Sequence, residues 1–188
     1  MSTVNEPAPG AESDEAGRVF YLYGAVMLAV QSFERNLATL ALILNCSHRT
    51  RQLKTREEVA RALQRTMNRS LDTYQRSSAK ALRNKLPDDF DAELLLEIEG
   101  MLKWRDRLAH RYLLERLVDV HAAHEFQPGT AEELMKLGAG FLTLAERLRE
   151  RLVGAVAELP SGRRGGVDEM IREWAQAIMA GEPWESDV

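Results

Sequence analysis

Apolar residues recur along this chain at alternating spacings of three and four, the period of one face of an α-helix. The first such stripe predicts a helix from about Asp14 to Asn45; its members are Tyr23, Met27, Val30, Leu37, Ala41 and Leu44. A later stripe predicts a second long helix; its members are Leu134, Leu137, Phe141, Leu144, Leu148 and Leu152. Stripes of this kind indicate helices that bury one face against each other.

Start signals divide the remaining chain into further helices. Thr55 and Glu58 have the capping-box spacing, in which each side chain bonds the other residue's backbone amide, and they predict a helix through Val59 and Leu63. Thr130 and Glu133, after Gly129, have the same spacing and predict the start of the helix that carries the later stripe. Pro87 and the two aspartates after it predict the start of another long helix, whose stripe is Leu94, Ile98, Met101, Arg105, Leu108 and Tyr112.

Shorter elements are expected elsewhere. Asn68 to Lys85 is less periodic, and we expect a break followed by a short helix there. The sequence from Pro160 to Gly166 is hinge-like, and a last short helix is expected from Val167 to Met179. Together these elements predict an all-α fold, a helical bundle of three or four long antiparallel helices with short additional helices.

The length and termini indicate one domain. A chain of 188 residues is long enough for a single core, and we expect the domain to span residues 14–188. Residues 1–13 are expected to form a disordered leader, because they have neither the basic nor the apolar region of a secretory signal. The apolar run from Val19 to Val30 has 12 residues, too few to span a bilayer. The single cysteine, Cys46, is expected to be a small buried hydrophobe in a reducing cytoplasm, with no membrane partner.

Charge is unevenly distributed along the chain. The net charge is −4, but the segment from Cys46 to Leu86 carries 11 Lys and Arg against 3 Asp and Glu. A basic segment on an acidic chain fits a polyanionic partner such as RNA. It also fits a solvated, Arg-rich helix face, and charge alone favours that interpretation.

Two charges occupy positions that their helices should bury. Glu34 lies in register with the first apolar stripe, and Arg105 lies in register with the stripe from Leu94 to Tyr112. An unpaired buried charge costs several kcal/mol, so such residues are paired or remain hydrated in a cleft. We therefore expect the two helices to face each other and Glu34 to approach Arg105.

His110 is the second candidate for chemistry on the Arg105 helix. Five residues at 100° each separate Arg105 from His110 by about 140° around a regular helix. Asp106 and His110 are four apart and could form a hydrogen bond. Joint action of Arg105 and His110 requires a distorted helix, a long reach by the Arg side chain, or a second subunit. A homodimer that buries Trp104 and Leu108 between two antiparallel copies of this helix would bring both patches into one groove.

The sequence "RDRLAHRY" resembles the R-x4-6-H motif of the HEPN superfamily, and Arg105, His110 and Tyr112 reproduce the R-x4-H-x-Y form of HepT-type toxins. The resemblance is sharp over about Leu94 to Leu117. It implies a helical bundle and a metal-independent ribonuclease, with Glu34 as the additional acidic residue on an earlier helix. Asp106 stands where the family commonly has Asn. In HepT-like systems the corresponding Tyr is modified by a nucleotidyltransferase-like antitoxin, which makes such an antitoxin a possible partner.

The residue types suit RNA cleavage through the 2′-hydroxyl. Histidine is the side chain that ordinarily transfers protons near neutral pH, so His110 could carry the proton. Arg105 is always charged and could stabilise the phosphorane. Asp106 could fix the imidazole tautomer, and Tyr112 could contact RNA.

No cofactor and no metal is expected, because His121 and His124 lack accompanying Cys or carboxylate ligands. The rival interpretations are a non-catalytic HEPN-like module that binds a nucleotide or a protein, and a helical dimerisation domain. The tryptophans Trp104, Trp174 and Trp184 are expected to pack rather than to stack on bases.

Overall fold

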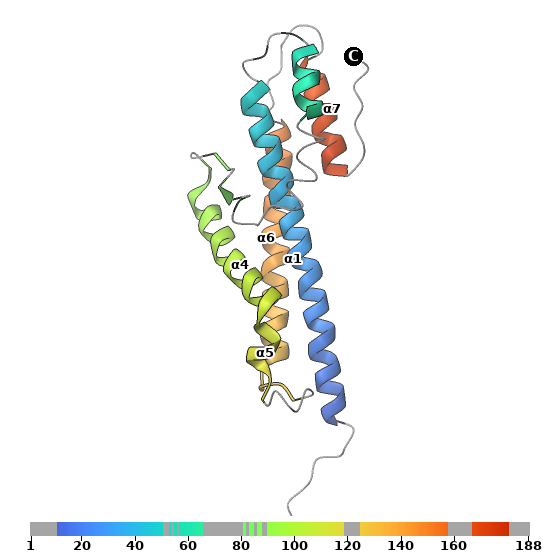
Figure 1. The fold of residues 1–188 in the computed structure, drawn as a ribbon, viewed down its shortest axis with the longest axis vertical. Helices are drawn as coiled ribbons and strands as arrows, with labels where there is room; N and C mark the ends of the chain where they lie inside the picture. Colours follow the sequence, from blue (N-terminus) through green and yellow to red (C-terminus); the bar gives the residue numbers. More distant parts are fainter. Residues whose placement is uncertain are drawn as a thin grey trace, which may run out of the picture.

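The computed structural model shows a bundle built of helices (Figure 1). It describes residues 11–50, 53, 55, 57–65, 81, 83–84, 86–87, 90–118, 125–157 and 167–180. Within these ranges there is no β-strand, and a single isolated bridge joins Leu117 to Phe126. The named helices are α1 (Ala11–Thr50), α4 (Ala92–His110), α5 (Tyr112–Arg116), α6 (Thr130–Ala157) and α7 (Val167–Ala180), and residues 57–65 are also helical. The all-α prediction is confirmed.

Helices α1 and α6 lie side by side along the long axis of the molecule (Figure 1). They run in the same direction, because the Phe33 ring of α1 lies 5.7 Å from the Phe141 ring of α6, and the Asn36 side chain, further along α1, donates to the carbonyl of Ala145, further along α6. Helix α4 lies between them in the chain and runs antiparallel to both, crossing α6 in Figure 1. Helix α7 and residues 57–65 lie at the end of the rod where α1 finishes.

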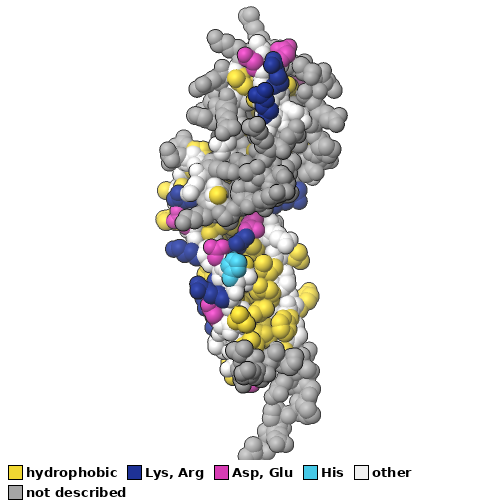
Figure 2. Space-filling view, in the orientation of Figure 1, with side chains coloured by type: hydrophobic (Ala, Val, Ile, Leu, Met, Phe, Trp, Pro, Cys, Tyr) yellow, Lys and Arg dark blue, Asp and Glu magenta, His cyan; other side chains and the backbone are white. Residues whose placement is uncertain are grey.

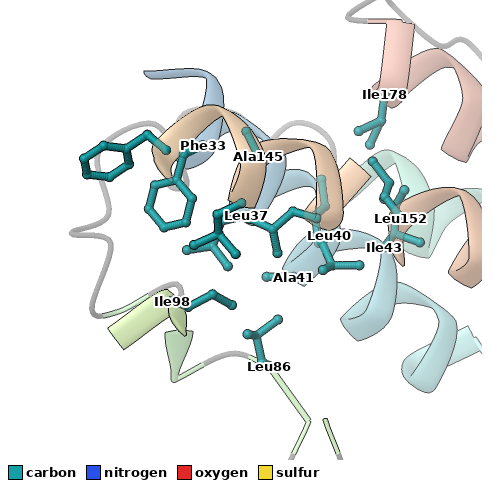
Figure 3. Packing of buried hydrophobic residues seen from close by; sticks show 14 of the residues in the cluster. Phe33, Leu37, Leu40, Ala41, Ile43, Leu86, Ile98, Ala145, Leu152 and Ile178 are labelled. Atoms are coloured by element: carbon teal, nitrogen blue, oxygen red, sulfur yellow. The ribbon is translucent and has the colours of Figure 1, made fainter. Parts of the chain in front are cut away.

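The core lies mainly between α1 and α6, and α4 and α7 close it (Figure 3). The later stripe was predicted correctly, since all six of its members on α6 are buried. On α1 the prediction was partly correct. Val30, Leu37 and Ala41 are buried, but Tyr23, Met27 and Leu44 are half-buried at the edge. The centre of the buried face is instead a series of residues seven apart, Val19, Val26, Phe33 and Leu40.

Other predicted features have mixed outcomes. The Thr55–Glu58 capping box is confirmed, with both reciprocal bonds at 3.2 Å. Cys46 is buried, and Trp174 is fully buried on α7, as expected. Helix α1 begins at Ala11, so the last three residues of the expected leader are helical. Predictions for the chain before residue 11, for the break near Asn68 and for the loop from 160 to 166 lie outside the described residues.

One predicted helix start was wrong, whereas α6 begins at Thr130 as predicted. The long helix does not begin at Pro87, whose carbonyl accepts a turn hydrogen bond from the Phe90 amide. It begins after Asp91, whose carboxylate accepts from the amides of Glu93 and Leu94 and so caps the helix.

The Thr130–Glu133 capping box does not form. The Thr130 hydroxyl donates to the Gln127 carbonyl at 2.6 Å, and the Glu133 carboxylate binds Arg116 and Tyr112. A cationic partner and a buried phenol are stronger partners for a carboxylate than a backbone amide is.

Candidate functional site

Arg105 is anchored by an acidic residue from the neighbouring helix, as the two anomalous charges predicted. Its Nε donates to Glu34 Oε1 on α1 at 2.7 Å, and its Nη1 donates to Asp106 Oδ1 at 3.1 Å. The Arg105 and Glu34 side chains are 29% and 28% exposed, so the pair is neither fully dry nor free in solvent.

The same partners set the protonation of Arg105. Burial lowers the pKa of the guanidinium, but the hydrogen bonds and charges of Glu34 and then Asp106 outweigh burial and raise this pKa above its ordinary value. The group is a permanent cation that can bind a phosphate oxygen, provided that its two carboxylate partners leave room for an anion.

His110 lies at the end of α4, where its side chain is exposed. The helix stops there because Arg111 adopts φ −150° and ψ −11°, and α5 starts at the next residue. The helix is regular from Arg105 to His110 and breaks only after the histidine, so the separation of about 140° around the helix remains. Joint action of the two residues therefore requires the reach of the Arg105 side chain or a second subunit. The predicted Asp106–His110 hydrogen bond is not found, since among the described residues Asp106 accepts from Arg105 instead.

A residue that the sequence analysis missed, Tyr23, supports this helix end. In an unbroken helix the Leu108 carbonyl would accept from the Tyr112 amide. Within the described chain that bond is absent, and the Tyr23 hydroxyl donates to the Leu108 carbonyl at 2.7 Å instead. Leaving a buried carbonyl without a partner costs about 1–3 kcal/mol. The sequence could have indicated this role of Tyr23, because the residue lies in the apolar stripe of α1 and a phenol that packs in a protein usually has a hydrogen-bond partner.

Tyr112 is not on the surface with His110, and this corrects the expectation that it contacts RNA. It is fully buried, and its hydroxyl donates to Glu133 Oε2 at 2.8 Å. Arg116 lies over its ring, with 5.5 Å between the guanidinium carbon and the ring centroid. Burial, followed by the bond to Glu133, raises the pKa of Tyr112 to about 12. In this conformation the hydroxyl is inaccessible to RNA and to a modifying enzyme.

Further charges surround the end of α4. Arg107 and Arg111 both bind Glu115 of α5, at 2.6 and 3.1 Å. The side chain of Lys103 is exposed. Figure 2 shows basic, acidic and histidine side chains gathered about half-way along the molecule, next to an apolar area.

The predicted dimer contacts of α4 are not both available. Leu108 is 1% exposed and packs in the core of its own chain. Trp104 is half-buried, with Arg107 5.0 Å above its ring. Leu108 is unavailable because the stripe that carries Arg105 faces α1, as the Glu34 pair requires.

No group of three or more potential metal ligands occurs among the described residues. His121 and His124, and the side chain of His48, lie outside those residues.

Comparison with known proteins gives no family assignment. No family model matches the chain, and no curated protein or solved structure shows significant similarity to it. The segment Glu15–Cys46 of α1 is long and apolar enough to span a membrane, but half of its most apolar window is buried inside the protein. A core helix passes the same test, and the burial of α1 against α6 fits that explanation.

Proposed function

We propose that the protein is a metal-independent endoribonuclease of HEPN type, acting as a toxin or in defence. The observation that carries the proposal is the fixed arginine on α4: Arg105, held by Glu34 across the helix interface, lies five residues before an exposed His110 at a helix break. This is the arrangement that the R-x4-H-x-Y resemblance implied, apart from the buried Tyr112.

In the proposed reaction, the 2′-oxygen of RNA attacks the adjacent phosphorus and the 5′-oxygen leaves. His110 takes the 2′-hydroxyl proton or supplies a proton to the 5′-oxygen. Arg105 stabilises the negative charge on the phosphorane, and Glu34 keeps the guanidinium in place. For this to occur, the Arg105 N–H group that now donates to Asp106 must donate to the phosphate instead, or to both acceptors.

RNA cleavage in EDTA tests this proposal. The wild type is expected to cleave, and Arg105→Ala and His110→Ala are each expected to lose at least about 100-fold in rate. Arg149→Ala is a matched control, because Arg149 is a largely exposed arginine on α6. Wild-type cleavage by His110→Ala would overturn the proposal.

We further propose a homodimer whose two copies share one cleft. With Leu108 buried, the apolar contacts must come from other residues, such as Leu114 of α5, which lies four residues after His110 and is 62% exposed. Leu114→Glu is expected to shift sedimentation towards the monomer. Val153→Glu is not, because Val153 lies in the second half of α6, away from this region. A monomeric wild type that cleaves RNA would refute the shared cleft.

A nucleotidyltransferase-like antitoxin remains a proposed partner, and the cytoplasm the proposed location. Since Tyr112 is buried, modification of Tyr112 would require α5 to open.

A second candidate function is a non-catalytic HEPN-like module that binds a nucleotide or a protein. The observation that favours it is the bond between Arg105 and Asp106, which occupies a guanidinium edge that a phosphate would use. Asp106→Asn is expected to increase cleavage if the catalytic proposal holds. If the protein is instead a non-catalytic module, neither the wild type nor Asp106→Asn should cleave RNA.

A further inference from the structure

The α1 residue Tyr23 contacts the same part of α4 as the proposed catalytic pair, but has no role in the chemistry proposed above. Its hydroxyl donates to the Leu108 carbonyl, two residues before His110 and three before the helix break at Arg111. The Arg111 amide still bonds the Arg107 carbonyl at 3.0 Å, so the regular ladder ends one carbonyl before Leu108. Tyr23 thus bonds the first carbonyl that the break releases.

This bond supports the broken conformation of the chain. In a regular helix the Leu108 carbonyl would accept from the Tyr112 amide. With the helix broken, the Tyr23 hydroxyl is the donor that satisfies this carbonyl. If α4 continued as a regular helix, the direction of the chain after His110 would change, and Tyr112 would leave its bond to Glu133. With the hydroxyl in place, the break is favoured and His110 is held at a helix terminus.

Tyr23 and Glu34 also belong to one face of α1. They are eleven residues apart, which is about 20° of rotation on a regular helix. Glu34 accepts a hydrogen bond from the Arg105 side chain, and Tyr23 donates one to the Leu108 carbonyl, two residues before His110. A single rigid helix therefore contacts both halves of the candidate site.

We propose that Tyr23 is a positioning residue, whose hydrogen bond to Leu108 fixes the helix break and so holds His110 at the last position of α4. The inference rests on the proposed ribonuclease function for its kinetic consequence. Its structural consequence can be measured without any cleavage.

The experiment compares Tyr23→Phe with Tyr21→Phe in the full chain. Phenylalanine keeps the ring packing and removes only the hydroxyl. Tyr21 is 76% exposed and within the described chain has no hydrogen bond through its hydroxyl, so its variant is the control for loss of a tyrosine hydroxyl. We expect Tyr23→Phe to reduce kcat about tenfold with KM changed less than about twofold, because misorientation affects the chemical step more than binding.

Two readouts are independent of catalysis. The NMR chemical shifts of the His110 imidazole, assigned with His110→Gln, are expected to change in Tyr23→Phe but not in Tyr21→Phe. Amide exchange from Tyr112 to Glu115 is expected to accelerate in Tyr23→Phe alone. If wild-type protein cleaves no RNA, the proposed function fails, and these two readouts still test the positioning. Unchanged His110 chemical shifts and unchanged amide exchange in folded Tyr23→Phe would overturn the inference.

Discussion

At the scale of single residues, the pair of Glu34 and Arg105 explains why a charge occupies a core position on each of two helices. Glu34→Ala leaves the half-buried Arg105 with Asp106 alone, and we expect a loss of about 1–2 kcal/mol in the free energy of unfolding. A double-mutant cycle with Arg105→Ala is expected to give a coupling energy of about 1 kcal/mol by chemical denaturation. Asp106→Ala is the control, because its carboxylate is 71% exposed and contributes little. A coupling energy near zero would show that the pair does not stabilise the α1–α4 contact.

Tyr112 should be visible in alkaline titration. Its folded pKa is about 12, above the ordinary value of 10. The neutral phenol is therefore favoured by the fold: this stabilisation is complete below pH 10 and is lost as the pH rises towards 12. Tyrosinate absorbance is expected to show a late step in the wild type that Tyr112→Phe lacks and Tyr21→Phe retains. Titration of every tyrosine near pH 10 would contradict the buried bond to Glu133.

At the scale of elements, apolar periodicity predicted which helices form and, on α6, which face is buried. It predicted the face of α1 less well because α1 packs against both α6 and α4, so that the buried surface is wider than one stripe. The same stripes predicted the Glu34–Arg105 contact, since a charge in register with a buried face requires a partner.

Helix ends were harder to predict. Asp91 and not Pro87 starts α4, and Glu133 binds side chains and not the helix backbone. Local spacing could not reveal either outcome, because the competing partners of Glu133 come from α5. The helix break after His110 and its support by Tyr23, 85 residues away, were likewise determined by tertiary contacts.

The glycines of α6 provide a test of helix packing. A Cβ at Gly138 would lie 3.3 Å from Val26 Cγ2 on α1, whereas a Cβ at Gly154 would meet nothing within 4 Å. Gly154→Ala is expected to stabilise the protein by about 0.5–1 kcal/mol through helix propensity. Gly138→Ala should gain less or lose stability, because valine is stiff in a helix and cannot easily move away. Equal increases in melting temperature for both variants would show that α1 and α6 are not in close contact there.

At the scale of the whole molecule, the candidate site lies on the flank of the rod that α4 covers (Figures 1 and 2). If RNA binds there through Lys103 and the arginines of α4, binding should weaken strongly with salt, because each phosphate contact releases counterions. We expect the logarithm of the affinity for a non-cleaved RNA analogue to fall linearly with the logarithm of salt concentration. Lys103→Ala should reduce the magnitude of this slope by about one, which is the contribution of a single phosphate contact. Leu96→Ala, an exposed change without charge on the same helix, should leave the slope unchanged. Salt-independent binding would exclude an electrostatic RNA surface.

The pairing of α1 with α6 also matters while the chain is being made. The apolar face of α1 is complete once Thr50 has been synthesised, but its main partner begins only at Thr130. At about 5–20 residues per second, the ribosome needs roughly 4 to 16 seconds to produce the 80 residues between them. During that interval the face containing Val19, Val26, Phe33 and Leu40 has no α6 to cover it. A nascent chain halted before residue 130 should therefore bind chaperones that recognise apolar helices, and one released after α6 has emerged should not.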